Sequence, residues 1–224
     1  MDDMPTRTST TPSVAGFLPY AVVASLQVIA LWIGDGGVAL ITKLLLMPLL
    51  AVGVLWARRL RGAPLVLLLV AIGFSWLGDS TAQFFPWLPN LPMMLLFFGI
   101  AHLAYIWLFQ RHLAVHRVPA WALVYLVWWV GMLLVLWPHL GDLRWAVAVY
   151  GLVLGGTAAS TARSVPMVAL GGAFFLCSDT VLALRLFIPD AMPWWTSPLV
   201  MLTYCLGQGL IVAGVVSTKK ARRG

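Results

Sequence analysis

The chain has 224 residues, of which 62% are hydrophobic and only 9% are charged, and its net charge is +7. A water-soluble domain of this length cannot bury so much apolar surface, so the composition excludes a soluble enzyme and indicates a membrane protein. The basic residues occur in short clusters between apolar runs rather than along one face. This distribution is typical of membrane topology and argues against nucleic-acid binding.

The apolar residues form eight runs, each close to the roughly 20 residues that a helix needs to cross a bilayer. Short turns separate the runs, so neighbouring helices must be antiparallel. We predict an all-α polytopic membrane helix bundle of about eight transmembrane helices. Its single transmembrane domain covers residues 17–217, between a polar tail (1–16) and a basic tail (218–224). The predicted helices are 17–33, 38–57, 64–85, 92–110, 119–137, 143–159, 166–187 and 194–217.

Basic residues are confined to alternate turns, and this alternation predicts the orientation of the chain. The remaining turns contain Asp35, Asp142 and Asp190 but no basic residue, and these aspartates are most simply solvated. Because basic turns stay on the cytoplasmic side, we predict that both tails are cytoplasmic and that the membrane is a bacterial inner (plasma) membrane. The basic residues on this side are Arg7, Arg58, Arg59, Arg61, Arg111, Arg117, Arg163, Lys219, Lys220, Arg222 and Arg223.

Four ionisable residues fall inside the predicted helices: Lys43, Asp79, His102 and Asp179. A charge within a bilayer is costly, so such residues are functional candidates. Counted from the basic turns at about 1.5 Å per residue, Asp79 and Asp179 both lie roughly 24–27 Å along outward-running helices. The four side chains are therefore expected to meet in one pocket in the non-cytoplasmic half.

Each candidate also has a simpler interpretation. Lys43 can extend its ammonium group to the headgroups. Asp79 can belong to an interfacial loop, and His102 can form an interhelical hydrogen bond. Asp179 can pair with Arg185, which is about one and a half turns away.

Two short similarities suggest an internal repeat. The segments 73–80 and 173–180 each have a Phe five residues before an Asp, and Lys43 near the start of the second run corresponds to Arg144 near the start of the sixth. A parallel repeat of two four-helix halves would explain both similarities.

No metal or cofactor site is indicated. His112 and His116 have the i, i+4 spacing of zinc ligands, but they lie in a basic loop that contains no carboxylate. The chain also contains no phosphate-binding loop, nucleophile elbow or dinucleotide fingerprint. We therefore expect no cofactor and no metal.

Five motifs in sequence order resemble the YhhN family, the lysoplasmalogenases, which are membrane enzymes that cleave the vinyl ether of lysoplasmalogens. The resemblance spans nearly the whole chain, although the polar stretch at 80–83 departs from the apolar continuation expected there. The motifs are TKLLLMPLL (Thr42–Leu50), SWLGD (Ser75–Asp79), FFGIAHLAY (Phe97–Tyr105), FFLCSD (Phe174–Asp179) and TYCLGQ (Thr203–Gln208).

The resemblance implies a lysophospholipid substrate, embedded in membrane lipid, and a set of polar site residues. Vinyl-ether hydrolysis needs a protonated carboxyl and a second carboxylate that stabilises the cation and activates water. We expect Asp79 and Asp179 to be this catalytic pair, with neither yet assigned as the acid. The substrate-binding residues would be Lys43 for the phosphate, and His102, Tyr105, Tyr204 and Gln208.

Two other functional classes stay open. Two intramembrane aspartates also suit a small transporter or channel that carries protons or a cation. A lipid-binding membrane protein without turnover is the third possibility. The sequence does not indicate an oligomeric state, a headgroup preference or a chain-length preference.

Overall fold

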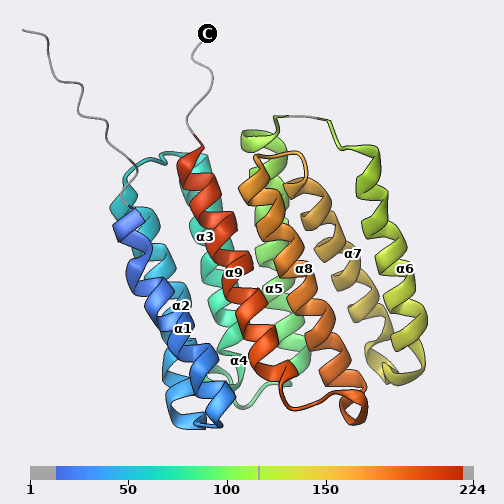
Figure 1. Cartoon of the computed structure of the whole chain (residues 1–224). Coiled ribbons are helices and arrows are strands. Elements are labelled where there is room, and N and C mark those ends of the chain that lie inside the picture. The colour runs from blue at the N-terminus through green and yellow to red at the C-terminus, as the bar shows by residue number, and fades with distance from the viewer. Residues whose placement is uncertain (1–13, 116, 219–224) are drawn as a thin grey trace, which may run out of the picture.

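The computed structural model describes residues 14–115 and 117–218, and within them every regular element is a helix. The helices lie side by side, and both ends of the described chain lie at the same end of the bundle (Figure 1). The all-α prediction is therefore confirmed. Most of the predicted tails 1–16 and 218–224 lies outside the described residues, as do Arg7 and the four basic residues of the C-terminal tail.

The first two helices form a hairpin with a very short turn. A 3₁₀ turn (Val14–Phe17) leads into α1 (Leu18–Ile33), and α2 (Gly36–Ala57) returns antiparallel to it. Gly34 ends α1 with a φ of 78°, a left-handed conformation that glycine adopts without steric cost. The Asp35 carboxylate then accepts the Val38 N–H at 3.0 Å and caps α2.

The third predicted helix is shorter than expected. The run 64–85 becomes α3 (Ala63–Asp79), followed by the single turn α4 (Thr81–Phe84). Ser80 leaves the helical conformation with φ −107° and ψ 12°, and the Thr81 hydroxyl donates to the Leu77 carbonyl at 2.9 Å. Such hydroxyl–carbonyl bonds bend or interrupt helices, so the polar residues after Asp79 set the end of α3.

The remaining helices match the predicted runs closely. Short 3₁₀ turns flank several of them, and Pro166 occupies the first position of α8, where its missing N–H costs nothing. The helices are α5 (Asn90–Leu108) with a π-helical turn (Phe109–Leu113), α6 (Val124–Leu136), α7 (Arg144–Thr161), α8 (Pro166–Phe187) and α9 (Thr196–Ser217).

The chain is an integral membrane protein by the length and composition of its helices. Within the described ranges, seven helical segments are long and apolar enough to cross a bilayer. The eighth, α3, has 17 residues and is apolar, which is the lower limit for a spanning helix. Large apolar side chains such as Leu134 (74% exposed) point outward, as in a lipid-facing surface.

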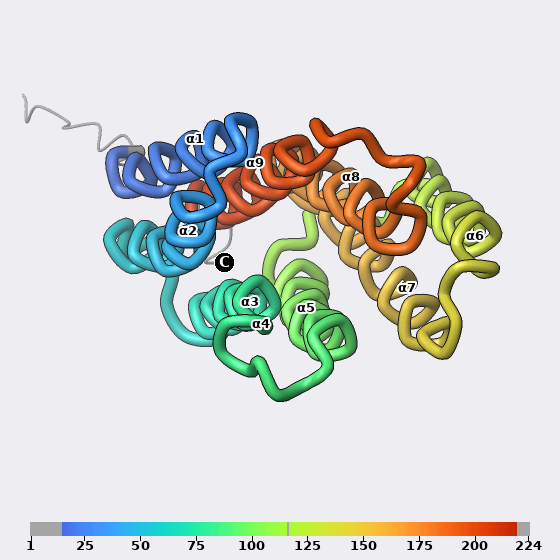
Figure 2. The backbone as a smooth tube through the Cα atoms, turned by 90° about the horizontal axis from the view of Figure 1, so that it is seen from below, coloured from blue at the N-terminus to red at the C-terminus, as the bar shows by residue number. Residues whose placement is uncertain are grey.

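Helix α9 is the most buried of the seven helical segments that are long enough to cross a bilayer. It packs against α8, α1 and α2, and Figure 2 shows it between the α1–α2 hairpin and α8. In the most apolar stretch of α9, 67% of the residues are buried, whereas in the segment that contains α6 only 11% are buried. Helix α3 packs on α5, α5 on α7, and α6 mainly on α7. Polar side chains on the inner face of α9 are therefore placed to meet residues from several helices.

The turns follow the predicted alternation. The α2–α3, α5–α6 and α7–α8 turns lie at the end of the bundle where the described chain begins and ends (Figure 1), and they carry six basic residues: Arg58, Arg59, Arg61, Arg111, Arg117 and Arg163. Three basic residues of the described chain lie toward the opposite end: Lys43 in the first half of α2, Arg144 in the first turn of α7 and Arg185 in the last turn of α8. The internal repeat stays a prediction.

Candidate functional site

The Asp79 carboxylate is held by residues from two other helices. Asp79 is the last residue of α3, and its side chain is only 7% exposed. The Tyr204 hydroxyl of α9 donates to its Oδ2 at 2.6 Å, and Lys43 Nζ of α2 lies 3.6 Å from its Oδ1. Asp79 is therefore a buried, ion-paired residue and not a solvated loop residue. The Lys43 side chain is 37% exposed, so its ammonium group contacts Asp79 while its surroundings stay partly open.

The Asp179 carboxylate has different partners. Asp179 lies in the interior of α8, and the Tyr150 hydroxyl of α7 donates to its Oδ2. The same hydroxyl lies 3.4 Å from His102 Nε2 on α5. Arg185, the alternative partner considered from the sequence, instead donates to the Thr196 hydroxyl. The hydrogen-bond partner of the Asp179 carboxylate is thus the neutral phenol of Tyr150 and not the guanidinium group of Arg185.

The prediction was that Lys43, Asp79, His102 and Asp179 share one pocket. In the structure they form two hydrogen-bonded groups, one around Asp79 and one around Asp179, on either side of one aromatic ring. The Phe175 ring of α8 makes edge contacts with His102 (centroids 4.9 Å apart) and with Tyr204 (5.4 Å apart). Tyr204 donates to Asp79, and His102 contacts the Tyr150 hydroxyl that donates to Asp179, so both groups are joined to the same ring. Counted from the first residues of α3 and α8 at about 1.5 Å per residue, Asp79 and Asp179 lie about 24 Å and about 20 Å along their helices. Their equal depth in a membrane stays a prediction.

A third group of polar side chains is closed off within the core. The Tyr105 hydroxyl donates to Gln208 Oε1 at 2.6 Å, and Gln208 Nε2 donates to Ser75 Oγ at 3.1 Å. All three side chains are fully buried. This chain of hydrogen bonds joins α5, α9 and α3 directly beneath the Asp79 group, so it fixes the positions of the helices that carry the site.

Two small apolar cavities meet at Asp179. One lies among α6, α7 and α8 and the other among α5, α7 and α8, and each has a volume of about 40 Å³. Asp179, Tyr150, Val147 and Ala183 line both of them. Each cavity is large enough for water next to the carboxyl group but smaller than a lipid chain.

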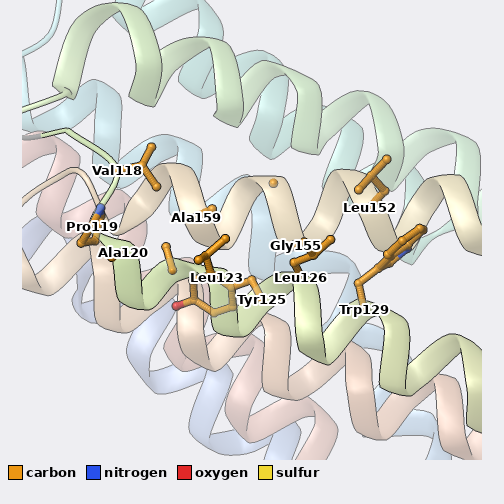
Figure 3. A pocket seen from close by; sticks show the side chains of 12 residues that line it. Val118, Pro119, Ala120, Leu123, Tyr125, Leu126, Trp129, Leu152, Gly155 and Ala159 are labelled. Carbon is orange, nitrogen blue, oxygen red and sulfur yellow. The ribbon is translucent and has the colours of Figure 1, made fainter.

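A wider groove of about 470 Å³ lies elsewhere, between α6 and α7 near the basic turns. Figure 3 shows its lining, which includes Pro119, Leu126 and Trp129 and contains no carboxylate. Because none of the candidate residues lines this groove, we place the candidate site at the two aspartates.

Two polar atoms beside the aspartates have no hydrogen-bond partner among the described residues: Ser80 Oγ and His102 Nδ1. Buried polar atoms are rarely left unpaired, and those that are often belong to functional sites. Ser80 directly follows Asp79 in the chain, and His102 contacts Tyr150, the donor to Asp179, so both unpaired atoms are candidates to bind water or a substrate oxygen. His116 lies outside the described residues, and the residues that are described contain no cluster of three or more potential metal ligands.

Two residues of the site, Tyr150 and Phe175, were not predicted from the sequence. Tyr150 follows Val147 and precedes Leu154 and Thr157 at helical spacing, and these three are all buried. This spacing alone could have shown that Tyr150 lies on the same face of the helix as Leu154 and Thr157. Phe175 had no such signal, since one more Phe in an apolar run is not distinctive.

Comparison with known proteins identifies one family. The sequence model of the YhhN family matches residues 38–215, from the start of α2 to the end of α9. No curated protein and no solved structure shows a significant match to the chain.

Proposed function

Because the chain belongs to the YhhN family, we propose that it is an intramembrane hydrolase that cleaves the vinyl-ether bond of lysoplasmalogens, or of a related lyso-ether lipid. The products are a fatty aldehyde and a glycerophospho-base. The observation that carries this proposal is the pair of buried carboxyl groups, Asp79 and Asp179, which come from different helices, have different partners and lie in groups of side chains that contact one aromatic ring, Phe175.

Two such carboxyl groups suit the chemistry of a vinyl ether. Protonation of the enol carbon, the double-bonded carbon that does not carry the oxygen, produces an oxocarbenium ion. Water then attacks the other carbon, which is bonded to the oxygen and bears the positive charge. One carboxyl group supplies the proton, and the second stabilises the cation and accepts a proton from the water. The groups of this chain suffice for these steps, so the proposal invokes no metal or organic cofactor.

The polar residues around the pair have separate roles in this proposal. Lys43 binds the substrate phosphate, because its ammonium group is a compact charge beside the site and is partly exposed. Tyr204 orients Asp79, and the unpaired His102 Nδ1 binds water or a substrate oxygen. The closed network of Tyr105 and Gln208 maintains the helix positions that the site requires.

The lipid chain reaches the site from the membrane. The cavities at Asp179 open among apolar side chains of α5, α6, α7 and α8, but at about 40 Å³ each they are too small for a chain. Side chains lining these cavities must therefore move when substrate enters. Of the helices that line these cavities, α6 is the least buried and packs mainly on α7, so it can move with the least loss of packing.

We further propose that the basic turns face the cytoplasm of a bacterial cell, so that Asp79 and Asp179 lie in the outer half of the inner membrane. The phosphate of a lysolipid in the outer leaflet would then lie at the depth of Lys43. Lys43 is in the second turn of α2, which begins at the end of the bundle opposite the basic turns.

The proposal is tested with purified protein in detergent and a panel of single-chain lipids. The panel contains a lysoplasmalogen, its saturated alkyl-ether analogue and the corresponding acyl lysophospholipid. We expect aldehyde from the lysoplasmalogen and no cleavage of the saturated ether, because that ether has no enol carbon to protonate. Turnover in detergent, without any gradient, excludes transport as the sole role. Fatty-acid release from the acyl lipid without aldehyde from the vinyl ether would overturn the proposal.

A further inference from the structure

The two carboxyl groups differ in the charges around them, and from this difference we infer that Asp179 is the acid that protonates the vinyl ether, that Asp79 is its ionised partner, and that Tyr150 positions Asp179. This inference rests on the proposed function and extends it, because it assigns each aspartate a separate role. It is carried by the contacts of the two carboxyl groups.

Asp79 has the contacts of a carboxylate that stays ionised. Lys43 Nζ lies 3.6 Å from Oδ1 and provides the opposite charge, while the Tyr204 hydroxyl donates a hydrogen bond to Oδ2. A cation and a hydrogen-bond donor both favour the negative form. An ionised Asp79 can stabilise an oxocarbenium ion and accept a proton from water.

Asp179 has no cation to balance a negative charge. Among the described residues, no Lys, Arg or His nitrogen forms an ion pair with it. The two cavities at Asp179 have apolar linings apart from Asp179 itself and Tyr150. A buried carboxyl group in such surroundings is more stable with its proton.

Tyr150 fixes which oxygen carries that proton. Its hydroxyl donates to Oδ2, whereas Oδ1 has no hydrogen-bond partner in the part of the chain that the structure describes. Oδ1 is therefore the oxygen left to hold the proton, at a carboxyl group that borders both cavities. His102 Nε2 lies 3.4 Å from the same hydroxyl, so it is a second polar neighbour of Tyr150.

The assignment gives a balanced reaction. The Asp179 acid transfers its proton to the enol carbon, whose π electrons form the new C–H bond, and Asp179 becomes a carboxylate. Water adds to the oxocarbenium carbon and gives one proton to Asp79, which produces a hemiacetal. The bond from this carbon to the glycerol oxygen then breaks, the glycerol oxygen takes the proton from Asp79, and the hemiacetal hydroxyl returns a proton to Asp179. One water is consumed, and both side chains regain their initial states.

Infrared spectroscopy tests the assignment without substrate. A protonated carboxyl group has a C=O stretching band that is separate from carboxylate bands and shifts in D₂O. At neutral pH we expect this band in the wild-type protein and in Asp79→Asn, and its loss in Asp179→Asn. A band that disappears in Asp79→Asn and remains in Asp179→Asn would reverse the assignment, and absence of the band from the wild type would refute it.

Tyr150→Phe tests the positioning role, with Tyr125→Phe as the matched control. Tyr125 lies on α6, where its ring packs against Trp121 and lines the wider groove that contains no carboxylate. Loss of the hydrogen bond to Oδ2 should shift the C=O band and lower the rate of aldehyde release roughly 3- to 10-fold, as expected for one hydrogen bond. Tyr125→Phe should leave both unchanged. An unshifted band in Tyr150→Phe would contradict the role.

The two proposals can fail separately. If the infrared band is lost only in Asp179→Asn, as predicted, but no lipid in the panel releases aldehyde, the proposed reaction is wrong and the protonation assignment still holds. If aldehyde is released but the band remains in Asp179→Asn, the proposed reaction holds and the assignment of the acid is wrong.

Discussion

Asp79→Asn and Asp179→Asn are each expected to lower aldehyde release from a lysoplasmalogen by at least about 10²-fold, the range that general acid–base catalysis contributes. Asn has nearly the same shape as Asp, and its carbonyl oxygen can still accept the hydrogen bonds from Tyr204 and Tyr150. The loss would therefore come from the missing acid or carboxylate rather than from a changed fold. Rates are measured with purified protein at saturating substrate.

The chain supplies its own controls for these variants. Asp142 and Asp190 are exposed residues of the short turns at the end of the bundle opposite the basic turns. Asp142→Asn and Asp190→Asn should retain wild-type rates, and all four variants should insert into membranes and elute as the wild type does on size exclusion. If either Asp79→Asn or Asp179→Asn turned over substrate at the wild-type rate, the proposed catalytic pair would be wrong.

The second large effect is expected from a glycine between α8 and α9. A Cβ atom on Gly207 would lie 2.8 Å from the Phe175 backbone nitrogen and 3.1 Å from the Gly171 carbonyl oxygen. Backbone atoms cannot move aside, so Gly207→Ala must separate the two helices. We expect a loss of about 1–3 kcal/mol in the free energy of unfolding. Phe175 and Tyr204 would move with these helices, so aldehyde release should fall as well.

Gly131→Ala is the matched control. Gly131 lies on α6, and a Cβ atom there would meet nothing within 4 Å. Alanine favours a helix over glycine by up to about 1 kcal/mol, so this variant should be as stable as the wild type or slightly more stable. Thermal unfolding in detergent compares the two variants. Equal melting temperatures for Gly207→Ala and the wild type would show that the close α8–α9 approach is not required.

The fold was predictable because the bilayer simplifies the problem. Runs of about 20 apolar residues separated by short polar turns leave few arrangements other than an antiparallel bundle. The end of α3 was predicted less well, since Ser80 and Thr81 interrupt the helix through local hydrogen bonds that a count of apolar residues does not register.

The candidate site was only partly predictable. Asp79 and Asp179 stand out because charge is rare inside apolar runs, and simple rise per residue placed them at similar depth. The division into two groups around Phe175 depends on which face each helix turns inward. In a membrane helix the lipid-facing and core-facing residues are both apolar, so the sequence carries little information on this rotation. Tyr150 is the exception, because its spacing with Leu154 and Thr157 was a signal in the sequence.

The most direct measurement on the central claim is the hydrolysis of a lysoplasmalogen by the wild-type protein in D₂O, with the aldehyde analysed by mass spectrometry. Protonation of the enol carbon by a buried acid predicts an aldehyde with one deuterium on the carbon next to the carbonyl group. Unlabelled aldehyde incubated with the protein under the same conditions should gain none. Aldehyde released without deuterium at that carbon, or no aldehyde at all, would contradict the account.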